Sequence, residues 1–198
     1  VGSEMCIRDS FFATTLYRER KIFSMLTQEH LQDAVDYGRC FIKLGSPASY
    51  IPELARVNKY QLGACIVNLD GTVMECGDTR TRFTIQSISK LASLILAISD
   101  KGSDYLFHDK VGVEPTGDPF NSIVKLETKT KPFNPFINAG AITVADCIEG
   151  NSSEEKFERF LSFVRKLCGD EEISLNEAVY LSEKATGDRN RALAYYLK

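Results

Sequence analysis

The residues best suited to chemistry gather in one short motif, Ser87-Ile88-Ser89-Lys90. Ser87 and Lys90 are three positions apart, so on a helix their side chains share a face and can touch. An apolar run follows them: Leu91, Leu94, Ile95 and Ile98. Such a run would desolvate the lysine and lower its pKa, so that its amine can act as a base toward the serine hydroxyl. The motif therefore predicts the serine–lysine pair of the S-x-x-K hydrolases.

The predicted helix over residues 87–100 adds to this interpretation, because it places Ser87 in a first turn whose free N–H groups favour an oxyanion or a carboxylate. An alternative fits the same residues equally well. Ser87 can be a plain helix cap, with the stem of Lys90 lying along apolar surface.

The spacing alone is not specific, since Ser122-Lys125 and Ser153-Lys156 also fit it. Ser153 sits among glutamates at a helix start, where a capping role explains it better. Ser122 lies in a Pro/Asn-rich stretch with no apolar helix behind it. His108 could activate a cysteine nucleophile, but no cysteine lies at a comparable helix start. We therefore interpret His108 as a loop histidine.

The first half of the chain predicts a helix and a hairpin. Helical periodicity runs over residues 27–44 and ends at Gly45-Ser46-Pro47, and Pro52 can open a short helix. The strands of the hairpin are expected over residues 62–69 and 72–76, because Asp70-Gly71 between β-rich runs is a strong turn signal.

The second half is mainly helical after a winding segment over residues 102–138. Helices are expected over 139–148, from Ser152 to Gly169, from Ser174 through Leu181, and over 189–198. Ser152 with Glu155, and Ser174 with Glu177, have the spacing of capping boxes. Helices with one hairpin predict the α+β class.

Composition excludes several classes of protein. The chain has 198 residues, of which 43% are hydrophobic, and this suits one domain with a hydrophobic core. Its net charge of -3 gives no indication of binding to nucleic acid or to a membrane surface. No apolar run approaches the roughly 18 residues of a membrane span. The six cysteines are widely scattered, with no CxxC pair. We therefore expect reduced thiols, no metal site and a cytoplasmic location.

The two ends differ from the rest of the chain. Residues 1–10 (VGSEMCIRDS) carry no helical, strand or signal-peptide pattern and resemble translated sequencing adapter. Residues 1–24 are accordingly expected to be an extension, with Met25 a plausible start and residues 25–198 the domain. Residues 189–198 read as a helix without a stop signal, so we expect the chain to be cut at this end too.

Five motifs, one of which contains Ser87 and Lys90, occur in one order and carry a family resemblance: residues 50–55 (YIPELA), 86–90 (QSISK), 112–117 (GVEPTG), 134–141 (NPFINAGA) and 183–190 (EKATGDRN). Together they closely resemble the serine-dependent glutaminases, the family of bacterial and kidney-type glutaminase. The resemblance runs from about Leu31 to the end of the chain, and several motifs in register are far more specific than any one of them.

The resemblance implies a β-lactamase/transpeptidase-like fold, a sheet packed by helices beside a helical subdomain, incomplete at its C-terminal side. It implies hydrolysis of L-glutamine to L-glutamate and ammonia, without a cofactor, by a homo-oligomer. Ser87 would be the nucleophile and Lys90 the base, with Tyr50 a proton-transfer partner. The residues expected to bind the ends of the substrate are Asn138, Glu183 and Asn190. Glu183 suits the ammonium, the two amides suit the carboxylate, and the Ser87 N–H suits an oxyanion.

Each of these residues also has a structural interpretation. Tyr50 can pack before Pro52, Asn138 and Asn190 can cap helices, and Glu183 can be a solvated helix carboxylate. Residue 133 is Phe, where relatives usually carry a polar or basic residue, which alters the expected pocket wall. Family members also continue past the equivalent of Lys198, so an unpaired sheet edge, poor stability and weak or no activity are expected of this chain.

Two rival functions remain open. One is a different S-x-x-K acyl hydrolase, of the penicillin-recognising type. Glu183 and Asn190 argue against this function, because they suit the charged ends of a free amino acid. The other is a non-catalytic glutamine-binding or assembly module that keeps the fold.

Overall fold

A computed structural model of the chain describes residues 26–121 and 131–198. The first ten residues and the Ser122-Lys125 pair lie outside the described residues. The chain divides into two compact units, with the boundary between Phe83 and Thr84. Among the described residues, no helix combines the length and hydropathy that crossing a membrane would require.

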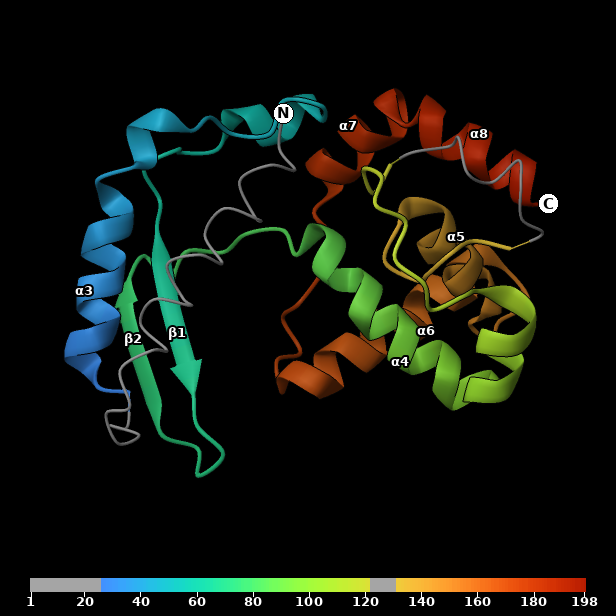
Figure 1. Ribbon diagram of the computed structural model, residues 1–198, viewed down its shortest axis with the longest axis horizontal. Helices are drawn as coiled ribbons and strands as arrows, with labels where there is room; N and C mark the ends of the chain where they lie inside the picture. The colour runs from blue at the N-terminus through green and yellow to red at the C-terminus, as the bar shows by residue number, and fades with distance from the viewer. Residues whose placement is uncertain (1–25, 122–130) are drawn as a thin grey trace. The chain divides into compact units, whose positions relative to one another are not determined.

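The first unit packs one helix against a hairpin (Figure 1). Helix α3 (Gln28–Arg39) lies beside the antiparallel strands β1 (Gly63–Val67) and β2 (Val73–Gly77), which pair Gly63 with Gly77 and Val67 with Val73. Their core consists of Leu31, Val35 and Cys76, with Leu62, Ala64, Ile66 and Met74 packed against it. The predicted hairpin is confirmed: Asp70 Oδ1 accepts a hydrogen bond from the Thr72 N–H, and Gly71 has a φ of 84°.

Helix α3 is shorter than the periodicity predicts. Thr27 caps its start, and it ends at Arg39 because the N–H groups of Cys40 and Phe41 bond the carbonyls three residues earlier, which tightens the chain. The 3₁₀ turns η1 (Ile42–Leu44) and η2 (Pro52–Arg56) follow, the second opened by Pro52 as predicted.

The second unit is helical. Its elements are the 3₁₀ turn η3 (Gln86–Ile88), α4 (Ser89–Lys101), the π-helix η4 (Tyr105–Lys110), α5 (Asn138–Cys147), α6 (Ser153–Cys168), α7 (Glu177–Thr186) and α8 (Asp188–Leu197). Helix α4 packs against α5 and α6, and α8 packs against α5 (Figure 1). The main core includes the fully buried Ala97, Leu106, Val111 and Val144. The sheet of the first unit and the helices of the second confirm the α+β class.

Two predicted helix starts need correction. Helix α4 begins at Ser89 rather than Ser87, because Gln86 has a φ of 42° and the chain passes through η3 first. Helix α7 is capped by Asn176, whose side chain accepts from the Val179 N–H, rather than by Ser174. Ser and Asn cap helices about equally well, so spacing alone could not choose between them. Ser152, in contrast, caps α6 as predicted, and Gly169 ends that helix with a φ of 63°.

Gly140 gives a test of the packing at the start of α5. A Cβ at this position would lie 1.9 Å from the Asn134 carbonyl oxygen and 3.0 Å from Pro135 Cα. We expect Gly140→Ala to lower the free energy of unfolding by about 3 kcal/mol, because backbone atoms must move apart. Urea unfolding measures this. Gly45→Ala is the matched control, since its nearest contact is 3.9 Å away and its φ is −100°. Equal urea midpoints for the two variants would contradict the packing described here.

Candidate active site

Ser87 lies in the turn that leads into α4, directly after a strained residue. Among the described residues, Gln86 is the only non-glycine residue with a positive φ. Its conformation is held by bonds at both ends, since Gln86 Nε2 donates to Thr84 Oγ1 at 3.0 Å and the Ser89 hydroxyl donates to the Gln86 carbonyl at 2.7 Å. The Ser87 side chain is exposed. Strained backbone held in this way is typical of functional sites, and here it fixes the backbone next to an accessible hydroxyl.

Lys90 lies on the first turn of α4 and is half-buried. Its Nζ donates to the Phe136 carbonyl and to Asn138 Oδ1, both at 2.8 Å, and lies 5.4 Å from the centre of the Phe120 ring. Burial lowers the pKa of the Lys90 ammonium. A neutral amine has two N–H groups and one lone pair, so two fixed acceptors leave the lone pair free to take a proton.

Asn138 connects Lys90 to Asn190. Its Oδ1 accepts from Lys90, and its Nδ2 donates to Asn190 Oδ1 at 3.0 Å. Helices α5 and α8 hold the two amides together because they pack through the buried Ala139 and Leu193. The capping interpretation of Asn138 and Asn190 is wrong, because the caps of α5 and α8 are Ile137 and Gly187 and neither helix has a side-chain cap. Helices α4, α5 and α8 thus bring together one amine and two side-chain amides.

The remaining predicted residues stand outside this hydrogen-bonded group. Tyr50 belongs to the first unit, where its ring is exposed beside the buried Ile51. Glu183 is exposed on α7, the helix that Gly187 joins to α8. Among the described residues, no hydrogen bond joins Ser87 to Lys90, whose donors point to Phe136 and Asn138. The contact predicted between the two side chains is therefore not seen in the described part of the chain.

The other candidate nucleophile patterns do not form sites. Ser153 is the first residue of α6, and Lys156 Nζ donates to the Asp146 carbonyl at 2.5 Å. His108 is exposed in η4 rather than in a loop, and its Nδ1 contacts Asp109 Oδ1 at 2.6 Å. In the part of the chain that the structure describes, no cluster of three or more acidic, histidine or cysteine side chains could hold a metal ion.

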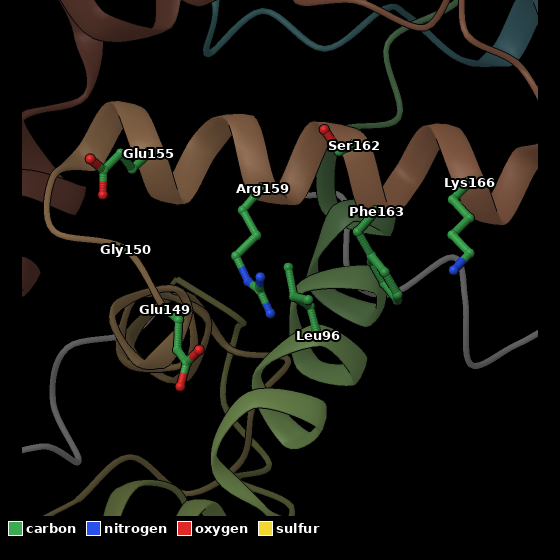
Figure 2. A pocket seen from close by; sticks show the side chains of 8 residues that line it. All are labelled: Leu96, Glu149, Gly150, Glu155, Arg159, Ser162, Phe163 and Lys166. Atoms are coloured by element: carbon green, nitrogen blue, oxygen red, sulfur yellow. The ribbon is translucent and has the colours of Figure 1, made fainter.

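A hollow of about 660 Å³ lies elsewhere, between α4 and α6 (Figure 2). It is lined by Leu96, Glu149, Gly150, Glu155, Arg159, Ser162, Phe163 and Lys166. Three of its ionisable side chains have partners within the fold: Arg159 pairs with Asp100, Glu149 pairs with Lys101, and Glu155 accepts a hydrogen bond from the Asn151 N–H. The hollow contains none of the predicted site residues, so we place the candidate site at Ser87 and Lys90.

Sequence reasoning missed two contributors to the site. The Phe136 carbonyl is a backbone group, which no residue type reveals, and Phe120 approaches Lys90 from the winding segment. The only available signal was the Asn134-Pro135 motif. Phe133, the departure noted above, is half-buried, and its carbonyl accepts a hydrogen bond from the Glu114 N–H at 3.0 Å.

Comparison with known proteins decides the family. The model of the family described as Glutaminase matches residues 45–198. The chain belongs to the glutaminase family. It is 57% identical over 170 residues to Glutaminase 2 of Clostridium perfringens. This alignment covers 85% of this chain and 55% of the relative.

Solved glutaminase structures agree. A Bacillus glutaminase in 4.3 M NaCl has a TM-score of 0.76 and 45% identity, covering 86% of this chain and 53% of that one. A second structure is that of a Bacillus subtilis glutaminase in covalent complex with 5-oxo-L-norleucine, formed by reaction with 6-diazo-5-oxo-L-norleucine. It has a TM-score of 0.71 and 40% identity, and the match covers 86% of this chain and 52% of that one. The predicted glutaminase family and its β-lactamase/transpeptidase-like fold are confirmed. The chain spans about half the length of the glutaminases it matches.

Proposed function

We propose that this glutaminase-family chain carries the machinery that hydrolyses L-glutamine to L-glutamate and ammonia through an acyl-enzyme on Ser87. The observation that carries the proposal is the setting of Lys90. Its half-buried amine is held by the Phe136 carbonyl and the Asn138 side chain, one helical turn from an exposed serine. Family membership supports the substrate.

The reaction follows from these groups. The hydroxyl proton of Ser87 passes to the Lys90 amine while Oγ bonds to the side-chain carbonyl carbon of glutamine. The C–N bond then breaks, and the amide nitrogen leaves as ammonia with the proton returned by Lys90. Water next attacks the carbonyl carbon of the glutamyl ester while Lys90 takes one of its protons. Lys90 then passes that proton to Oγ as the C–Oγ bond breaks, which releases glutamate and restores Ser87.

We assign the remaining predicted residues to the ends of the substrate. Glu183 would accept from the α-ammonium, and Asn138 and Asn190 would donate to the α-carboxylate. Asn138 and Asn190 are already hydrogen-bonded to each other, which supports a shared role. Tyr50 would assist proton transfer, and the Ser87 N–H would stabilise the oxyanion.

The test is glutamate release from L-glutamine, with L-asparagine as the competing substrate. The assay is run on the chain itself and on a fusion in which the remaining C-terminal part of the Clostridium perfringens relative follows Lys198. Release of glutamate supports the proposal. Glutamine binding measured by calorimetry without turnover in either form would instead favour a binding module, and covalent labelling of Ser87 by a β-lactam would favour a penicillin-recognising hydrolase.

The pH dependence has a definite sign. Lys90 must be neutral to accept the proton, and burial lowers the pKa of its ammonium below the ordinary 10.5. We therefore expect kcat/KM to rise with pH through that lowered pKa and to level off above it. Stability changes in the same direction, because the unfolded chain binds this proton more tightly than the folded one. A kcat/KM profile that falls over this range would contradict the assignment of Lys90 as the base.

We further propose a homo-oligomer that works in the cytoplasm. The five cysteines among the described residues are all free thiols, which supports a reducing compartment. Sedimentation of the purified protein tests the assembly, and a monomer at assay concentrations would contradict it.

A further inference from the structure

Asn134 links the segment that leads to the Phe136 carbonyl to the backbone at Glu114. Its Nδ2 donates to the Glu114 carbonyl at 2.9 Å, and its Oδ1 accepts from the N–H groups of Phe136 and Ile137 at 3.0 and 3.2 Å. One half-buried amide thus makes three hydrogen bonds to backbone groups. None of these bonds touches Ser87 or Lys90, so Asn134 is not itself a reacting group.

Both sides of this segment are pinned close to Asn134. On one side, the Gly112 N–H donates to the Pro132 carbonyl at 2.8 Å. On the other, the Asn134 carbonyl presses against Gly140, so closely that a Cβ there would stand 1.9 Å away. The chain from residue 132 to the start of α5 is therefore held at both ends, with Asn134 in the middle.

The Phe136 carbonyl depends on this arrangement. Phe136 has an exposed side chain, so packing of its ring does not hold its backbone. Its carbonyl nevertheless accepts from Lys90 Nζ at 2.8 Å. Asn134 Oδ1 accepts from the Ile137 N–H, which lies in the same planar peptide as the Phe136 carbonyl, and from the N–H of Phe136 itself.

We infer that Asn134 is a positioning residue for the reaction: its side chain holds the Phe136 carbonyl against Lys90, so that two acceptors orient the amine toward Ser87. This inference rests on the proposed function. Without the Asn134 amide, the Phe136 carbonyl leaves the amine, and Asn138 alone holds it. A displacement of about 1 Å at a catalytic group costs on the order of 100-fold in rate.

The experiment compares Asn134→Ala with Asn134→Asp in the form of the protein that turns over glutamine. Asp keeps the oxygen that accepts from Phe136 and Ile137, and both residues form such turns. We expect Ala to lower kcat roughly 10- to 100-fold with KM within about threefold, and Asp to restore most of the loss. Asp170→Ala is the matched control, because Asp170 Oδ1 accepts from the Glu172 N–H with the same two-residue spacing at 2.8 Å.

A double variant separates positioning from folding. The readout is the rate at which 6-diazo-5-oxo-L-norleucine labels Ser87, followed by mass spectrometry. In a protein that already carries Lys90→Ala, adding Asn134→Ala should not lower the labelling rate further, because Asn134 acts through the lysine. An equal fold-loss with and without Lys90, or equal rates for Asn134→Ala and Asp170→Ala, would overturn the inference while leaving the function standing. Absence of labelling and turnover in the unmodified protein would overturn the proposed function and the inference together.

Discussion

Replacing Ser87 by alanine should lower kcat for glutamine by roughly 10⁴-fold or more, with little change in thermal stability. The loss is large because no acyl-enzyme can form without the Oγ that attacks the amide. Stability should hold because Ser87 is exposed and the bond that secures this turn comes from Ser89 to the Gln86 carbonyl. Glutamate release, measured in the form of the protein that turns over glutamine, and a thermal melt of both proteins measure the two effects.

Ser99→Ala is the matched control for that variant. Ser99 lies on α4 as well, and its hydroxyl donates to the Ile95 carbonyl at 2.9 Å. It should keep normal turnover. Full activity in Ser87→Ala would show that Ser87 is not the nucleophile, whatever the family resemblance.

Replacing Lys90 by methionine is expected to lower kcat by roughly 10³-fold, the scale of a lost general base. Methionine has a similar length but neither donates nor accepts a proton, so the Phe136 carbonyl and Asn138 Oδ1 both lose their donor. The rise of kcat/KM with pH should disappear along with the rate. Steady-state kinetics across neutral and alkaline pH measure both.

Lys156→Met is the control for that variant, since Lys156 belongs to the second S-x-x-K pattern among the described residues. Its Nζ bonds Asp146, so we expect no change in kcat and only a small change in stability. Retention of the pH-dependent rise in Lys90→Met would contradict the role of Lys90 as the base.

Much of the fold could be predicted from the sequence, because the sequence signals for its turns, caps and helices are local. The Asp70-Gly71 turn, the Ser152 cap and the apolar periodicity of α4 each depend on a few neighbouring residues, and each is confirmed. The family followed from several motifs in register rather than from one. The pairing of Ser87 with Lys90, which rests on their spacing and on the apolar helix behind them, stays a prediction.

The rest depends on backbone geometry that residue types do not encode. Gln86 has a φ that propensity does not predict, so the start of α4 was placed at Ser87 instead of Ser89. The second acceptor of Lys90 is a carbonyl, which every residue carries. Asn138 showed its partners only once α4, α5 and α8 were packed together.

The most direct test of the central claim is the site of covalent capture. The protein is incubated with 6-diazo-5-oxo-L-norleucine, the reagent that forms the covalent complex in the Bacillus subtilis relative, and the modified peptide is sequenced by mass spectrometry. The proposed mechanism predicts a single modification, on Ser87, which L-glutamine slows and Ser87→Ala removes. Modification of another residue, or modification that persists in Ser87→Ala, would contradict it.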